Sequence, residues 1–202
     1  MATDRNAATA AAARALHAGH VVGFPTETVY GLAVRAEDPA ARRRLARLKG
    51  RPDGKPFQVL VADRAKALEI CPGLPPAALR LAKAFWPGPL TMVVRDARGR
   101  WQGLRVPDHA LARRLIRKAG GAMVATSANR SGEPPVRTAA ELVATFGDGV
   151  AAVLDGGPPQ SGRASTVVKV GARKWEMIRE GAISRREIAA VAGVDNERKS
   201  LL

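Results

Sequence analysis

The stretch VVGFPTETVYGLAV, residues 21–34, decides the class of fold. Residues 21–24 are a short apolar run that predicts a buried β-strand, and residues 28–34 contain enough β-forming side chains to predict a second strand. The link between them, Pro25-Thr26-Glu27, is polar. Because α/β folds commonly place ligands at strand ends, this stretch predicts a sheet with a binding edge.

Helix and strand signals alternate along the rest of the chain. Thr3 or Asp4 is expected to cap the first helix and Asp108 a later one, while Ser184 with Glu187 forms a capping box for the last helix. The expected helices cover residues 5–18, 39–49, 63–69, 75–85, 109–119, 139–146 and 185–192. The expected strands cover residues 21–24, 28–34, 57–62, 90–95, 103–106, 123–126, 150–154, 166–170 and 175–178.

The order of these elements predicts the domain organisation. They follow no regular βαβ cycle and show no repeat, so we predict a single α/β domain with a mixed sheet. This domain is expected to cover residues 1–193, and the short charged tail at residues 194–202 is expected to be flexible. Residues 156–162 form the one internal stretch that resembles a linker.

The composition is typical of a globular protein. Hydrophobic residues make up 46% and charged residues 25% of the 202 residues, which argues against disorder. The apolar runs are far shorter than the roughly 20 residues of a membrane span, and the first residues lack the apolar stretch of a signal peptide. The single cysteine, Cys71, excludes an internal disulfide and a cysteine-rich metal site. We therefore expect a cytoplasmic protein with no membrane partner.

The charge balance points to an acidic partner. There are 33 lysines and arginines against 18 aspartates and glutamates, which gives a net charge of +15. Nucleic acid, nucleotide phosphates and an anionic membrane surface would each be attracted, and arginine on solvated helix faces would give the same balance without a partner. Aromatic residues make up only 4%, few for a protein that stacks the bases of single strands.

Several common catalytic motifs are absent from the sequence. It contains no G-x-x-x-x-G-K-[ST] loop, no G-x-S-x-G and no H-E-x-x-H. Of the three histidines, His17 and His20 flank an expected helix end, and His109 lies at the start of another helix. A hydrolase based on a Ser-His dyad or a zinc site is therefore disfavoured.

Three polar segments remain as candidate binding loops. Residues 25–32 offer hydroxyl groups and a carboxylate, and residues 126–132 (TSANRSG) follow an expected strand and are rich in hydrogen-bond donors. Residues 49–56 carry three cations on a loop shaped by glycine and proline, namely Lys49, Arg51 and Lys55. Such a loop suits phosphate oxygens.

These segments belong to a longer series of motifs. The series runs through residues 25–32 (PTETVYGL), 49–52 (KGRP), 55–56 (KP), 85–91 (FWPGPLT), 105–109 (RVPDH), 127–132 (SANRSG), 165–168 (STVV) and Arg179 before 181–183 (GAI). In this order the sequence resembles the YrdC-like family of threonylcarbamoyl-AMP synthases in its short, single-domain form. The resemblance extends over nearly the whole chain.

The resemblance implies a fold and a reaction. The fold is a three-layer α/β domain whose twisted mixed sheet is flanked by helices around a basic cavity. The reaction is the condensation of L-threonine, bicarbonate and ATP to threonylcarbamoyl-AMP and pyrophosphate, with Mg²⁺ held mainly by the ATP phosphates. The product is expected to pass to a transferase complex that forms threonylcarbamoyladenosine in tRNA, and direct contact with tRNA or double-stranded RNA is a further expectation.

Matching motif positions imply roles for individual residues. No side chain is implied as a nucleophile, because positioning and charge stabilisation, here by Lys49, Arg51 and Lys55, can promote such a transfer. The positions similar to nucleotide-binding residues are Arg51, Lys55, Thr91, Ser127, Asn129 and Arg179. The positions similar to threonine-binding residues are Thr26, Tyr30, Arg105 and Ser165, of which Arg105 suits the carboxylate and Tyr30 a wall of the pocket.

One departure from the family pattern leaves the substrate open. Some long-form relatives carry a histidine that contacts threonine where this chain has Leu60, so the amino-acid pocket here is less polar or completed differently. A paralogue that uses the same ATP chemistry on another carbamoyl substrate is one alternative. An RNA-binding or ribosome-associated module, drawn to polyanions by its positive charge, is another.

Overall fold

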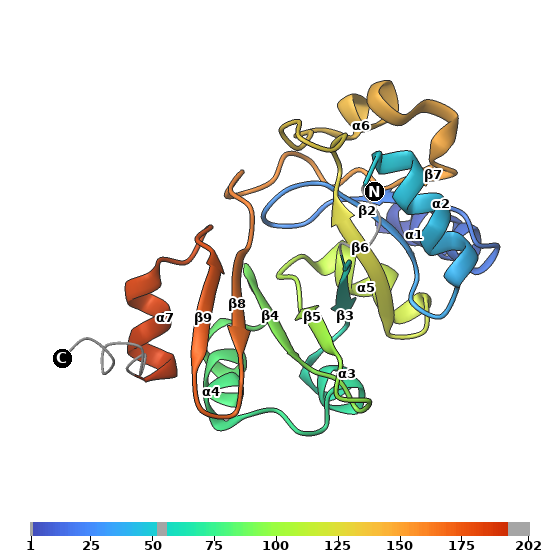
Figure 1. Ribbon diagram of the computed structural model, residues 1–202. Coiled ribbons are helices and arrows are strands. Elements are labelled where there is room, and N and C mark those ends of the chain that lie inside the picture. Colours follow the sequence, from blue (N-terminus) through green and yellow to red (C-terminus); the bar gives the residue numbers. More distant parts are fainter. Residues whose placement is uncertain (1, 52–55, 194–202) are drawn as a thin grey trace.

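The strands form one mixed sheet. The computed structural model describes residues 2–51 and 56–193, and within these ranges nine strands pair in the order β7-β1-β2-β6-β3-β5-β4-β8-β9 (Figure 1). The pairs β1/β7, β3/β5 and β4/β8 are parallel and the others antiparallel, which confirms the predicted mixed sheet. The strands are β1 Val22–Phe24, β2 Gly31–Arg35, β3 Gln58–Val61, β4 Leu90–Arg95, β5 Trp101–Arg105, β6 Ala122–Ser127, β7 Ala152–Val153, β8 Thr166–Val170 and β9 Trp175–Arg179.

The helices begin where the sequence supplies caps. The Ser184 hydroxyl accepts from the backbone of Glu187, whose carboxylate accepts from the backbone of Ser184, so the predicted capping box is confirmed. Asp63 caps α3 in the same way by accepting from the Lys66 amide. The helices are α1 Ala2–His17, α2 Pro39–Lys49, α3 Arg64–Ile70, α4 Pro76–Phe85, α5 Ala110–Lys118, α6 Ala139–Phe146 and α7 Arg185–Ala192, with a 3₁₀ turn at Gly147–Gly149.

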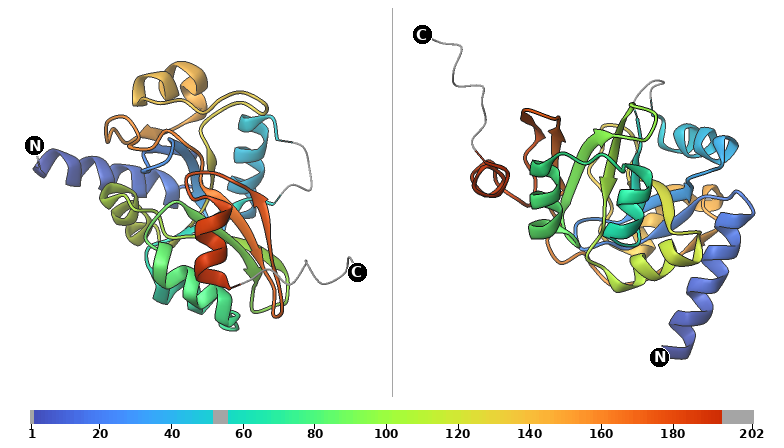
Figure 2. Two further views of the ribbon diagram at one scale, coloured as in Figure 1. Left: turned by 90° about the vertical axis from the view of Figure 1, so that its left-hand side faces the viewer. Right: turned by 90° about the horizontal axis from the view of Figure 1, so that it is seen from below.

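Helices cover both faces of the sheet because the strands alternate apolar side chains. On β2, Leu32 and Val34 join a core with α2 and α4, whereas Ala33 joins a second core with α1 and α5. Strand β3 divides in the same way, with Leu60 in the second core. Figures 1 and 2 show α1, α2 and α6 around one end of the sheet and α4 and α7 side by side at the other. The result is three layers, as expected from the sequence.

Part of one sheet face is left without a helix. On β4 and β8, Met92 and Val168 point into the core beside α4, while Thr91 and Val167 line a cavity on the opposite face. The alternation of side chains along a strand therefore gives the cavity a floor of β-strand residues.

Two predicted helix caps are wrong. Helix α1 already begins at Ala2, so Thr3 and Asp4 lie inside it. Asp108 does not cap α5: the N-cap position is His109, and the Asp108 carboxylate instead accepts from Arg113 Nη1 at 2.9 Å. An arginine one turn into the helix competes with the backbone amides for this carboxylate.

The strand predicted over residues 28–34 begins later, at Gly31. The Thr26 hydroxyl accepts from the amides of Thr28 at 3.3 Å and Val29 at 3.2 Å, which folds residues 26–29 into a turn. Strand β7 is likewise shorter than predicted, with two residues instead of five. At residues 26–29, hydrogen bonds between the Thr26 side chain and the backbone outweigh the strand propensity of the sequence.

The stretch predicted to be a linker is bonded to the segment between β1 and β2. The Tyr30 hydroxyl donates to the Gly157 carbonyl at 3.0 Å, and the Ser161 amide donates to the Glu27 carbonyl at 3.0 Å. The expected tail at residues 194–202 lies outside the described residues. Within the ranges that the structure describes, no helix is long and apolar enough to cross a membrane.

Candidate functional site

A cavity of about 690 Å³ lies on the uncovered face of the sheet, within the size range of small-molecule sites. All three polar segments singled out in the sequence contribute to its wall. Lys55 lies outside the described residues. The other predicted site residues all line this cavity: Thr26, Tyr30, Lys49, Arg51, Thr91, Arg105, Ser127, Asn129, Ser165 and Arg179. The structure thus brings together residues that are up to 153 positions apart in the sequence (26 to 179).

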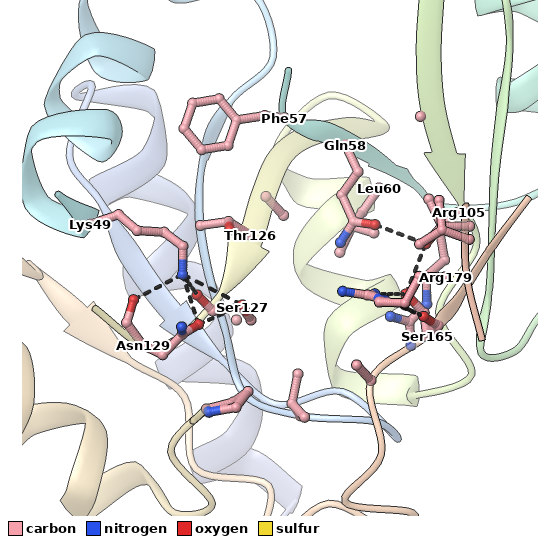
Figure 3. Close-up of a pocket in the computed structure, with 18 of the residues that line it drawn as sticks. Lys49, Phe57, Gln58, Leu60, Arg105, Thr126, Ser127, Asn129, Ser165 and Arg179 are labelled. Atoms are coloured by element: carbon pink, nitrogen blue, oxygen red, sulfur yellow. Dashed lines mark hydrogen bonds between the residues drawn. The ribbon is translucent and has the colours of Figure 1, made fainter. Parts of the chain in front are cut away.

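One side of the cavity is a cluster that we call the lysine cluster, made of Lys49, Ser127 and Asn129 (Figure 3). Lys49, at the end of α2, is only 5% exposed, and its Nζ donates to the carbonyls of Ser127 at 2.9 Å and Asn129 at 2.8 Å. It also donates to Asn129 Oδ1 at 2.7 Å. The three N–H groups of the ammonium are therefore all used within the protein.

The side-chain amide of Asn129 is also fully hydrogen-bonded within the protein. Its Oδ1 accepts from Lys49 and also from the Ser127 hydroxyl at 2.5 Å, while its Nδ2 donates to the carbonyls of Arg130 at 2.8 Å and Glu133 at 2.7 Å. The lysine cluster thus fixes the loop that leaves β6.

Burial lowers the pKa of both cationic groups on this side. It lowers the pKa of Lys49 to about 8, and the neighbouring charge of Arg51 contributes to the same shift. Burial also lowers the pKa of Arg51, whose guanidinium lies 4.8 Å from the centre of the Phe57 ring and donates to the Pro56 carbonyl at 2.8 Å. A polyanion that enters the cavity would favour the charged forms of both groups.

The opposite side of the cavity is a second group, which we call the hydroxyl cluster: Gln58, Thr91, Ser165 and Arg179 (Figure 3). The Thr91 hydroxyl donates to Gln58 Oε1 at 2.9 Å and lies 3.0 Å from the Ser165 hydroxyl. Arg179 Nη2 donates to the Ser165 carbonyl at 2.8 Å and to its hydroxyl at 3.3 Å. Partial burial of the guanidinium, followed by the charge of Arg105, lowers the pKa of Arg179.

Arg105 is held beside this cluster by a buried ion pair. Its Nη2 donates to Glu27 Oε1 and to the Thr28 hydroxyl, both at 2.8 Å, and its Nε donates to the Gly88 carbonyl at 3.2 Å. The side chains of Arg105 and Glu27 are 4% and 9% exposed. Among the described residues, no partner is recorded for the other terminal nitrogen, Nη1, so its two N–H groups remain for a ligand.

Two glycines let the backbone come close enough to build this side. A Cβ at Gly88 would lie 2.5 Å from the Phe85 carbonyl oxygen, so only glycine fits the turn that accepts from Arg105. A Cβ at Gly181 would lie 2.3 Å from the Ala164 oxygen, beside the start of β8. Close approach there allows the Thr166 hydroxyl to accept from the Gly181 amide at 3.0 Å.

Tyr30 and Thr26 have structural contacts as well as places in the wall. The Tyr30 hydroxyl is used by residues 155–157, where its one proton lies within reach of Asp155 Oδ1 at 3.2 Å and of the Gly157 carbonyl at 3.0 Å, and burial raises its pKa. The Thr26 hydroxyl donates to the Val29 carbonyl at 2.6 Å. Both side chains therefore contribute shape to the cavity more than free polar groups.

Several residues of the site were not predicted from the sequence. Gln58 and Phe57 line the cavity without having been singled out, and Glu27 was noted only as part of a polar segment. Trp101 also lines it, between Arg95 at 4.1 Å and Lys169 at 4.5 Å from its ring centre. The alternation of β3 was the available signal for Gln58, because Leu60 lies two residues further on the same strand face.

Most of the charged side chains that line the cavity are positive. Its described lining includes four cations, Lys49, Arg51, Arg105 and Arg179, and one carboxylate, Glu133. In the part of the chain that the structure describes, no three histidine, cysteine, aspartate or glutamate side chains come together as a metal site.

A family model described as "Telomere recombination", which covers Sua5, YciO and YrdC, matches residues 14–181. The chain belongs to the Sua5/YciO/YrdC family. It is 39% identical over 203 aligned positions to the threonylcarbamoyl-AMP synthase of Bacillus subtilis. That alignment covers 95% of this chain but 58% of the relative, so the chain spans less than two thirds of that protein.

The matched share differs among other relatives and solved structures of the Sua5/YciO/YrdC family. The threonylcarbamoyl-AMP synthase of Thiobacillus denitrificans is 40% identical over 79% of this chain and 89% of its own. Among solved structures, Pyrococcus abyssi Sua5 complexed with L-threonine superposes with a TM-score of 0.87 and 33% identity, over 93% of this chain and 58% of Sua5. Escherichia coli YciO, at 22% identity and a TM-score of 0.80, supports the fold alone, over 89% and 92% of the two chains.

Proposed function

We propose that this protein is an L-threonylcarbamoyladenylate synthase, which condenses L-threonine, bicarbonate and ATP to threonylcarbamoyl-AMP and pyrophosphate. The observation that carries the proposal is a cavity in which a cationic, phosphate-suited side faces a side that suits an amino acid. Relatives named for this activity and a Sua5 structure holding L-threonine support the same conclusion.

The proposed chemistry needs no side-chain nucleophile. The ammonium group of threonine first releases a proton to solvent. The resulting amine forms a C–N bond with carbon dioxide and releases a second proton, or forms it with bicarbonate as water leaves, and becomes a carbamate. A carbamate oxygen then attacks the α-phosphorus of ATP, the bond from that phosphorus to the bridging oxygen breaks, and pyrophosphate leaves with the electron pair. The protein's task is to hold two substrates in line and to stabilise negative charge.

ATP is proposed to bind between the two clusters. Arg51 and Arg179 would neutralise phosphate oxygens from opposite sides, and the Ser127 oxygen, whose proton is donated to Asn129, would accept from a donor of the nucleoside. Thr91 lies in the same wall, but its proton is donated to Gln58, so its oxygen can only accept. Lys55 is proposed for the same role from its position in the sequence. Mg²⁺ would enter with ATP, coordinated mainly by its phosphates, and would neutralise part of their charge.

Lys49 and Asn129 are proposed to act through the loop that they hold. Their polar groups already bond one another and the backbone of residues 127–133. They would therefore keep donors of this loop in place for the nucleotide, and the charge of Lys49 would add to the positive potential.

L-threonine is proposed to bind against the hydroxyl cluster. Arg105 offers the two N–H groups of Nη1 to the carboxylate, while Glu27 and Gly88 keep the guanidinium in one orientation. Thr26 and Tyr30 would form part of the wall and Ser165 a polar contact. Leu60, fully buried in the same wall, would leave the threonine methyl group an apolar surface.

The test is pyrophosphate release by purified protein with MgATP and bicarbonate. It should depend on L-threonine and be accompanied by a product with the mass of threonylcarbamoyl-AMP. Because serine lacks one methyl group, L-serine should react about 10-fold to 200-fold less efficiently. Threonine-independent release, or no release by protein that binds ATP, would contradict the proposal, and the second result would favour a related enzyme with another carbamoyl substrate.

A second function, contact with RNA, is favoured by the surface of α2. Its side chains Arg42, Arg43, Arg44 and Arg47 are exposed, and the chain carries a net charge of +15. Contact with tRNA would also bring the labile product near the transferase complex that is proposed to use it. Binding that drops steeply between about 50 and 200 mM salt and is unaffected by threonine would support this function.

A further inference from the structure

Gln58 crosses one strand to reach its partner. It pairs in register with Gly103 on β5, and a Cβ at Gly103 would lie 3.4 Å from the Gln58 Cβ and 3.7 Å from Thr91 Cγ2. Because position 103 has no side chain, the Gln58 amide passes over β5 and accepts from the Thr91 hydroxyl of β4. In Figure 3 this contact continues to Ser165 as a chain of dashed lines.

This contact determines where two buried protons point. A hydroxyl has one proton, and Thr91 donates its proton to Gln58 Oε1 at 2.9 Å. At the 3.0 Å contact between the two hydroxyls, Ser165 must therefore be the donor and Thr91 the acceptor. Arg179 donates to Ser165 at the other end. In this series of hydrogen bonds, every donor points from Arg179 towards Gln58.

We infer that Gln58 is a positioning residue which orients these protons, so that Thr91 and Ser165 present only acceptors to the substrate. Each oxygen retains one lone pair after its two contacts, and both residues are nearly buried, at 3% and 4% exposure. A carboxylate or phosphate oxygen would find no proton there. The group that binds at these two hydroxyls must itself be a donor.

The neighbouring residue identifies that donor as the ammonium group of an α-amino acid. Val93 pairs with Gly103, so Thr91, two residues along the same face of β4, lies beside Arg105 on β5. Arg105 Nη1 offers two N–H groups to a carboxylate. The acceptors Thr91 and Ser165 therefore lie about one strand spacing from the Arg105 cation. An α-amino acid carries an ammonium group and a carboxylate on the same carbon atom, so it can bind the acceptors and the cation at once. This inference rests on the proposed function and adds the direction in which the amino acid lies.

Two variants and a control test the inference. Gln58→Leu removes the acceptor, whereas Gln58→Glu keeps an acceptor and has no N–H donor. Gln102→Leu is the matched control, because Gln102 lies on the opposite face of β5 and donates to the carbonyls of Phe57 and Gly103. The ligands are L-threonine and 3-hydroxybutyrate, which has the carboxylate and hydroxyl of threonine without its amine, with Kd measured by calorimetry.

Wild-type protein should prefer threonine over 3-hydroxybutyrate by about 100-fold, because loss of the amine leaves the buried acceptors without a partner. Gln58→Leu should weaken threonine binding about tenfold and leave 3-hydroxybutyrate unchanged, so that the preference falls by the same factor. Gln58→Glu should stay within about threefold of wild type, because the direction of the protons is preserved. Gln102→Leu should not change the preference.

Three results would overturn the inference alone. They are an unchanged preference in Gln58→Leu, an equal loss in Gln102→Leu, or a loss in Gln58→Glu as large as in Gln58→Leu. The last would mean that Gln58 donates to Thr91. A folded wild-type protein that binds no L-threonine would instead overturn the proposed function and the inference together, so the two failures are distinguishable.

Discussion

The two sides of the cavity use their polar groups differently. In the lysine cluster, the ammonium of Lys49 and the amide of Asn129 are fully bonded to each other and to the loop after β6. In the hydroxyl cluster and at Arg105, bonding to residues that the structure describes is incomplete. One lone pair on Ser165, one on Thr91 and Arg105 Nη1 have no partner among them.

The difference suggests that charge alone does not identify a ligand contact. Lys49 is one of the three cations in the loop at residues 49–56, yet its ammonium holds the backbone in place. Arg105 is also buried, but its hydrogen bonds to the described residues use three of the five N–H groups of the guanidinium and leave the two on Nη1. One side of the cavity is therefore built for rigidity and the other for recognition, and variants on the two sides should separate stability from substrate binding.

The largest effect is expected from Arg105→Met. It leaves the buried carboxylate of Glu27 without its cation, which should lower the free energy of unfolding by about 3–5 kcal/mol in urea denaturation. The double variant Arg105→Met, Glu27→Gln removes the unpaired charge and should regain most of the stability without regaining threonine binding. If the double variant binds threonine normally, Arg105 does not hold the carboxylate.

Lys49→Met should have the next largest effect, in the opposite cluster. It leaves the carbonyls of Ser127 and Asn129 without their donor, which should cost about 1–3 kcal/mol of stability and increase amide exchange in residues 127–133. The KM for ATP should rise more than the KM for threonine. Lys83→Met, at an exposed position of α4, is the control. Unchanged exchange in the loop would contradict the positioning role of Lys49.

Arg51→Ala tests a charge that faces the cavity. Removal of the guanidinium should lower kcat/KM for ATP more than tenfold, because a charged hydrogen bond contributes about 1.5–3 kcal/mol when desolvated. Stability should change less than in Lys49→Met, since Arg51 is only partly buried. The exposed Arg64→Ala serves as comparison. Near-native turnover would remove Arg51 from the proposed phosphate site.

The smallest effect is expected from pH. Because burial lowers the pKa of Lys49 to about 8, kcat/KM for ATP should fall several-fold above that pH, as the ammonium loses a proton and a donor. Stability should change in the opposite direction. Between about pH 8 and the ordinary lysine pKa of 10.5, the unfolded chain binds more protons than the folded chain, so the contribution of Lys49 to the free energy of unfolding rises with pH.

The variant Lys49→Arg distinguishes the titration of Lys49 from that of other ionisable groups. Its guanidinium stays charged throughout the range, so the decline near pH 8 should disappear from the pH–rate profile of any active Lys49→Arg protein. A decline at the same pH in this variant would assign the titration to another group.

Much of the fold could be predicted from local patterns. The spans of β4, β8 and α6 agree with the sequence expectation, because alternating or helical apolar residues are bounded there by turn residues and caps. The prediction was wrong where a side chain makes an unforeseen hydrogen bond, with the backbone at Thr26 and with the Arg113 side chain at Asp108. The family motifs located ten positions that the structure brings to one cavity, and their individual roles stay predictions.

The sequence by itself determined the class of fold, the positive charge and ten of the residues that line the cavity, because caps, periodicity and motifs act over a few neighbouring residues. Only the tertiary structure decided which of these polar groups remain free. The partners of Gln58 and Thr91 are 33 and 74 positions away, across strands whose order in the sheet differs from their order in the chain. A hydrogen bond depends on that spatial order, so its direction and its unused lone pairs appear only once the sheet is assembled.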